Sequence, residues 1–276
     1  MSALLLFGSN GIVASCISLP SQEIVLLRTF IGSLFLISLF RLSGQKEGRI
    51  SDKRHLRFLI FSGTAMGASW MFLYEAYRLI GVSIASLLYY CGPVIVMAVS
   101  PVVFKERLTS RKLGGFTAVL IGIAAINMQS AYEGRSNLGL LYGGLSAMMY
   151  AFMVIFSKKA CSISGMRNSM LQLVVSFLTV AACNGIKSGL VIQVTKGDWI
   201  PILVLGAINT GFGCCLYFSS INRLPVQTVA TLGYLEPLSA VAFSVVFLNE
   251  MLQPSLILGA ALIIGGAVFA EGRSME

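Results

Sequence analysis

The stretch Tyr90-Cys91-Gly92-Pro93 opens a block that runs to Gly122, and a second block opens with Tyr234-Leu235-Glu236-Pro237, a shift of 144 positions. The residues that keep their identity under this shift are Tyr90, Pro93, Ala98, Ser100, Val102, Glu106, Leu108, Gly115 and Gly122. Matched Tyr, Pro, Glu and Gly are informative because each has its own backbone or solvation requirement. The chain is therefore interpreted as a tandem duplication, with repeats at residues 1–132 and 133–276.

The composition places both repeats in lipid. Of the 276 residues, 56% are hydrophobic and 11% are charged, and the mean hydropathy is +0.84. A soluble domain carries roughly 25% charged residues. Apolar runs occur along the whole length, which excludes a soluble domain with a single anchor.

Ten apolar segments predict an all-α integral membrane protein with ten transmembrane helices. They span residues 2–19, 24–40, 58–79, 82–104, 113–131, 138–157, 170–186, 200–221, 226–248 and 256–270. A helix of about 20 residues crosses the ~30 Å hydrocarbon layer. The first segment lacks a basic lead, so it is interpreted as a membrane helix, with the completeness of the N-terminus left open, rather than as a signal peptide. Residues 41–57 are expected to form a loop.

The basic residues predict the orientation. With a cytoplasmic N-terminus, fifteen of the 20 Lys and Arg residues fall on the inner side and four on the outer side, while Arg28 lies within the second segment. This bias follows the positive-inside rule and places both termini in the cytoplasm. It also explains the net charge of +9 without a nucleic-acid partner.

The number of crossings predicts how the repeats are related. Five is odd, so the second repeat enters the membrane from the opposite side, and the two five-helix repeats are inverted around a shared central cavity. This architecture is typical of secondary transporters, because exchanging the conformations of the halves converts an inward-open state into an outward-open one.

Glu236 is the foremost candidate for a functional residue, since it is an acidic side chain near the expected bilayer centre. A charge there costs at least ~2.5–3.5 kcal/mol, so it should face a cavity and be paired or protonated. It could carry a proton, bind a substrate amine or pair with Arg28, and a purely structural ion pair is the alternative. Pro93 and Pro237 predict symmetric helix kinks, serving either the cavity or packing.

Further polar and aromatic residues at membrane depth are candidates for the cavity wall or, alternatively, for helix packing. The expected cavity set is Asn10, Tyr90, Pro93, Asn209, Tyr217, Tyr234, Glu236 and Pro237. Arg28 and Glu75 could pair with one another, whereas Arg78 is expected to reach the headgroups. Gly114, Ala118 and Gly122 form a small-residue face that predicts close helix packing, within one protomer or across a dimer.

The sequence carries no catalytic set and no ATP-binding loop. Its six cysteines lack metal-site spacing, and its single histidine lies in a polar loop. We therefore expect no enzyme activity, no cofactor and no metal site.

The two blocks resemble the ends of two EamA domains, and Leu6-Phe7-Gly8-Ser9-Asn10 resembles the start of the first. Over essentially its whole length the chain is similar to ten-helix bacterial members of the drug/metabolite transporter superfamily. The resemblance implies a bacterial inner-membrane protein whose cavity is lined by helices one, three, four, six, eight and nine, and ATP-independent export or exchange of small metabolites. One departure is Gly92 where the second block has Glu236.

These observations predict an alternating-access transporter that exports a small metabolite such as an amino acid, as a monomer or a homodimer, with protons as a candidate coupling ion. A polyspecific drug efflux pump with an aromatic wall is the first alternative. An integral-membrane enzyme acting on lipid-linked substrates is the second, and it would require an acid/base cluster at headgroup level.

Overall fold

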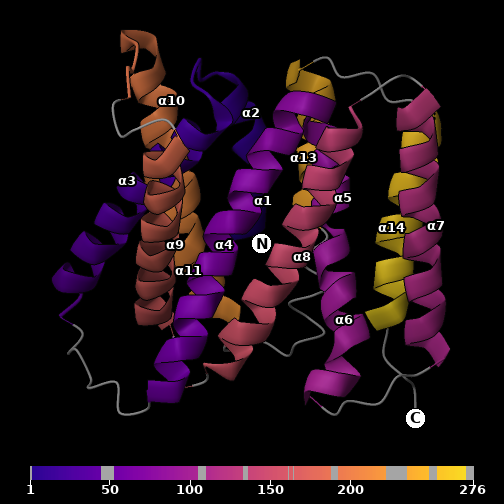
Figure 1. Cartoon of the computed structure of the whole chain (residues 1–276), viewed down its shortest axis with the longest axis horizontal. Helices are drawn as coiled ribbons and strands as arrows, with labels where there is room; N and C mark the ends of the chain where they lie inside the picture. The colour runs from indigo at the N-terminus through magenta and orange to yellow at the C-terminus, as the bar shows by residue number, and fades with distance from the viewer. Residues whose placement is uncertain are drawn as a thin grey trace.

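The computed structural model describes residues 2–44, 53–104, 110–132, 136–160, 162–163, 165–187, 192–221, 235–248 and 254–271. These residues form an antiparallel bundle of helices (Figure 1). Its first half contains α1 (Ser2–Gly8), α2 (Asn10–Ser15), α3 (Ser21–Leu42), α4 (Lys53–Ile80), α5 (Val82–Tyr89), α6 (Cys91–Phe104) and α7 (Ser110–Tyr132). The second contains α8 (Asn137–Lys159), α9 (Gly165–Lys187), η1 (Lys196–Asp198), α10 (Trp199–Leu203), η2 (Val204–Phe212), α11 (Gly213–Ile221), α13 (Leu235–Leu248) and α14 (Pro254–Glu271).

The fold class predicted from the sequence is confirmed. Five described helices are long and apolar enough to cross a membrane: α3, α4, α8, α9 and the continuous helix Lys196–Tyr217. Helices α3, α4, α8 and α9 are longer than the apolar segments that predicted them, because polar ends continue them. The expected loop at 41–57 is accordingly shorter: α3 continues to Leu42 and α4 begins at Lys53.

Helix boundaries repeat with the same shift of 144 residues that relates the two sequence blocks. Helices α3, α6 and α7 begin at Ser21, Cys91 and Ser110, while α9, α13 and α14 begin at Gly165, Leu235 and Pro254. In Figure 1, α3 and α9 run in opposite directions, as do α7 and α14. Corresponding helices of the two halves are thus inverted.

Two of the expected spanning segments are broken, and one contains a stretch of π-helix. The first divides at Ser9 into α1 and α2, and the fourth divides at Tyr90 into α5 and α6. The fourth break follows from Pro93, which cannot donate a hydrogen bond to the Tyr89 carbonyl four residues earlier. In the eighth segment, η2 is a π-helix. Only the second part of the ninth segment lies within the described residues.

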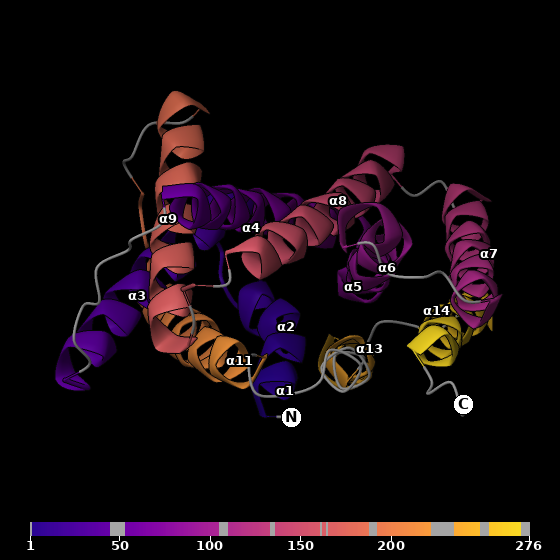
Figure 2. The same cartoon turned by 90° about the horizontal axis from the view of Figure 1, so that it is seen from below.

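The small-residue faces lie between α7 and α14, a pair that stands at one side of the bundle (Figure 2). A Cβ atom added at Gly122 would lie 2.8 Å from the Gly259 carbonyl oxygen, and one at Gly266 would lie 2.8 Å from the Gly115 carbonyl oxygen. The predicted close packing therefore occurs within one protomer. It joins the last helices of the two halves.

Candidate substrate site

The break between α1 and α2 is held by Asn209 of the π-helix. Its side-chain amide donates to the Leu6 carbonyl at 3.0 Å, to Ser9 Oγ at 3.0 Å and to Asn10 Oδ1 at 3.1 Å. The Leu6 carbonyl near the end of α1 also accepts from Ser9 N and Ser9 Oγ, so Asn209 adds a further donor there. Asn10 and Asn209, which the sequence placed in one site, thus lie together, both buried.

Close packing of Gly8 brings α13 against the same break. A Cβ at Gly8 would lie 1.9 Å from Ser239 Oγ and 3.0 Å from the Glu236 carbonyl oxygen. Only glycine leaves room for this approach. The motif that precedes Asn10 therefore positions the Glu236 segment.

Arg28 lies buried between α3, α4 and the π-helix, with 1% of its surface exposed. Its Nε donates to Thr210 Oγ1 at 2.9 Å, and its Nη1 donates to the Tyr74 hydroxyl. The guanidinium also lies 4.4 Å from the ring centre of Trp70, within cation–π range. These contacts fix its orientation.

The π-helix geometry explains how Thr210 reaches Arg28. Thr210 Oγ1 donates to the Leu205 carbonyl at 2.7 Å, five residues earlier, and accepts from Arg28 at the same time. Gly206 and Gly211 let α3 approach, since added Cβ atoms would each lie 2.7 Å from the nearest side-chain atom, in Ile31 and Phe35. Arg28 is thereby hydrogen-bonded to the π-helix.

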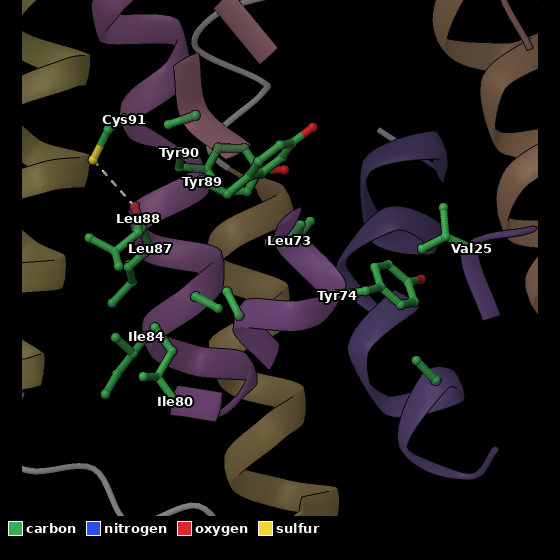
Figure 3. Packing of buried hydrophobic residues seen from close by; sticks show 14 of the residues in the cluster. Val25, Leu73, Tyr74, Ile80, Ile84, Leu87, Leu88, Tyr89, Tyr90 and Cys91 are labelled. Carbon is green, nitrogen blue, oxygen red and sulfur yellow. Dashed lines mark hydrogen bonds between the residues drawn. The ribbon is translucent and has the colours of Figure 1, made fainter. Parts of the chain in front are cut away.

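Tyrosines gather where α5 meets α6. Tyr89 packs edge-on against Tyr90 and Tyr150, with ring centres 5.2 and 5.1 Å apart. Figure 3 shows Tyr89 and Tyr90 together at this junction. Tyr217 packs against Phe7 at 5.9 Å and interacts with Tyr150. Tyr90 and Tyr217, both members of the expected cavity set, thus belong to one aromatic cluster.

Glu236 is the second residue of α13, half-buried next to this cluster. Its carboxyl group interacts electrostatically with Tyr90 and with Arg28. The Tyr90 hydroxyl is buried and has no hydrogen bond of normal geometry within the described part of the chain. The site thus holds a carboxylate and a guanidinium that do not form a salt bridge.

Glu75 does not pair with Arg28, in contrast to the expected pairing. Its carboxylate forms a salt bridge with Arg78 Nη2 at 2.6 Å, and the Arg78 side chain is 60% exposed. The two residues are three positions apart on α4, close to its end. Glu75 therefore pairs with Arg78, its neighbour on the same helix face, rather than with Arg28.

The remaining predicted residues are only partly placed. Pro93 is half-buried in the first turn of α6. Pro237 lies in α13 without a described side chain, and Tyr234 lies outside the described residues. The prediction missed Thr210 as a ligand of Arg28, and Trp70 and Tyr74 as its aromatic partners. The spacing of Trp70 and Tyr74, four residues apart on one helix face, was the available signal.

Comparisons with known proteins show the family and the fold of the chain. The model of the EamA-like transporter family matches residues 1–128 and 137–271. The uncharacterized transporter YxxF of Bacillus subtilis (strain 168) is 26% identical, covering 99% of this chain and 92% of its own. The threonine/homoserine exporter RhtA of Escherichia coli (strain K12) is 23% identical, covering 88% and 79%. A crystal structure that is 19% identical shares the fold, with a TM-score of 0.71 over 98% of this chain and 95% of the other.

Proposed function

This chain belongs to the EamA-like transporter family, and on that premise we propose that it is an ATP-independent, alternating-access exporter of a small metabolite such as an amino acid. The supporting observation is that a basic residue, Arg28, and an acidic residue, Glu236, lie among aromatic side chains where the inverted halves meet. Charged side chains at membrane depth generally mark transport pathways. RhtA, a relative named for threonine and homoserine, supports the amino-acid class.

The moving units in this proposal are residues 1–132 and 133–276, which rock against each other around a central cavity. Substrate binds there among Asn10, Tyr90, Pro93, Asn209, Tyr217, Tyr234, Glu236 and Pro237. Both termini face the cytoplasm of a bacterial inner membrane. The support is that Arg41, the first turns of α4, α7 and α9 and the end of α8 put basic residues at one end of the bundle (Figure 1).

Transport into proteoliposomes tests the proposal. Labelled threonine and homoserine should enter liposomes holding the purified protein faster than protein-free liposomes, without ATP. Glu236→Gln should lower that rate at least tenfold, while Leu34→Ala, at a half-exposed position on α3, should not. Absence of transport for every amino acid in a panel would refute the amino-acid class.

Proton coupling is tested in the same liposomes with and without a pH gradient. If Glu236 carries the proton, the gradient changes the wild-type rate and leaves the Glu236→Gln rate unchanged. A Glu236→Gln variant with the wild-type rate and pH dependence would remove this role.

The tyrosine cluster also favours a second candidate, a polyspecific drug efflux pump, because aromatic rings bind flat organic cations. Expressing cells challenged with toxic cations and with toxic amino-acid analogues separate the two. Resistance to the cations alone would favour drug efflux.

A further inference from the structure

Arg28 has donors that the protein leaves unused. A guanidinium offers five N–H donors. Nε and Nη1 bind Thr210 and Tyr74, whereas Nη2 is buried and has no hydrogen-bond partner among the described residues. A buried donor without a partner is costly, so its presence at membrane depth points to a missing acceptor.

The missing acceptor is also needed for charge. In the described part of the chain, Glu75 forms its salt bridge with Arg78 and not with Arg28. Glu236 influences Arg28 electrostatically without reaching salt-bridge distance. Aromatic faces and two hydroxyls offset only part of the cost of an ion at this depth. An anionic group would supply the rest.

The geometry favours a carboxylate over a diffuse anion. The guanidinium is held from two helices, by Thr210 of the π-helix and by Tyr74 and Trp70 of α4. With Nε and one Nη1 donor used, the donors of Nη2 and the second N–H of Nη1 remain for the two oxygens of a carboxylate. A lysine could not offer this planar fork.

The opposite pole of the site is Glu236. Its carboxylate is half-buried beside the Tyr90 hydroxyl, which itself has no partner of normal geometry within the residues described. A carboxylate at this position is suited to an ammonium group, with Tyr90 able to accept a further N–H. The two poles lie in different halves of the chain, so one ligand that touches both would bridge them.

We propose that the transported molecule is a zwitterion whose carboxylate binds Arg28 and whose ammonium group binds Glu236, as an α-amino acid would. This inference rests on the proposed function and adds the residues that bind the carboxylate and the ammonium group of the substrate. It also predicts rejection of lipophilic cations that carry no carboxylate.

Competition against labelled threonine in proteoliposomes tests the proposal. The competitors are threonine, threonine methyl ester, which lacks the anion, and N-acetylthreonine, which lacks the cation. The wild-type protein should prefer threonine to either derivative by at least tenfold. Arg28→Gln should lose the preference over the ester and keep the preference over N-acetylthreonine. Glu236→Gln should show the reverse pattern.

Arg28→Lys guards against a variant that does not fold, since it retains the charge. It should keep a reduced preference over the ester, because a point charge replaces the fork. Threonine transport in which both Arg28 variants keep the full tenfold preference would overturn the proposal while leaving the proposed function intact. A wild-type protein that moves no amino acid would overturn both.

Discussion

Gly92 and Tyr150 are in contact across the two halves: a Cβ atom added at Gly92 would lie 2.5 Å from Tyr150 Cδ1 and 3.1 Å from the Ala147 carbonyl oxygen. Gly92 corresponds to Glu236 under the repeat shift, and Tyr150 corresponds to Leu6. The tyrosine ring thus occupies the space that a side chain at position 92 would need. This contact explains why the site contains one carboxylate rather than a symmetric pair.

We predict that Gly92→Ala lowers the free energy of unfolding by about 1–3 kcal/mol, the usual cost of overpacking. The measurement is thermal unfolding in detergent. Gly144→Ala is the matched control, because a Cβ there meets nothing within 4 Å. Adding Tyr150→Leu, which introduces the residue found at the corresponding position of the first repeat, should recover most of the lost stability. A double variant no more stable than Gly92→Ala would contradict this account.

Asn209→Ala should weaken the α1–α2 break. The substitution removes the donor that Leu6, Ser9 and Asn10 share. The Leu6 carbonyl keeps its bonds from Ser9, whereas the buried Asn10 Oδ1 loses its described donor. An unsatisfied buried group costs ~1–3 kcal/mol, so we expect a destabilisation of that size together with loss of transport. The exposed Asn137, at the start of α8, provides the control Asn137→Ala. Equal stability of the two variants would argue against the role of Asn209.

Much of this arrangement could be predicted from the sequence, because membrane helices follow apolar length, and Pro93 lies three residues after the observed break. The odd number of crossings in each repeat also predicted the inversion. The break at Ser9 and the π-helix could not be predicted, since both depend on partners such as Asn209 and Arg28 from other helices. The partners of Arg28 could not be predicted for the same reason. Thr210 is distant from Arg28 in sequence and contacts it only because the helices pack together.

Glu75→Gln should have little effect on stability or transport. The Glu75–Arg78 pair lies near the end of α4 with Arg78 largely exposed, and such pairs contribute roughly 0–1 kcal/mol. Transport of threonine by Glu75→Gln and Glu236→Gln, measured side by side, distinguishes a peripheral acid from one in the site. A tenfold loss with Glu75→Gln would return Glu75 to the list of site residues.

Leu42 and Ile186 test the inverted arrangement directly. They occupy corresponding positions of the two repeats, near the ends of α3 and α9, and their side chains are 85% and 86% exposed. Because the halves are inverted, these equivalent residues lie at opposite ends of the bundle (Figure 1).

In a variant lacking the native cysteines, Leu42→Cys should react with a membrane-impermeant maleimide only after cells are opened. The basic residues near Leu42 favour the cytoplasmic side for that end of the bundle. Ile186 lies at the opposite end, so Ile186→Cys should react in intact cells. The reverse pattern would invert the proposed orientation and preserve the fold. Labelling of both positions from the same side would contradict the inversion itself. Equivalent helix ends lie on the same side of the membrane only if the two halves are parallel.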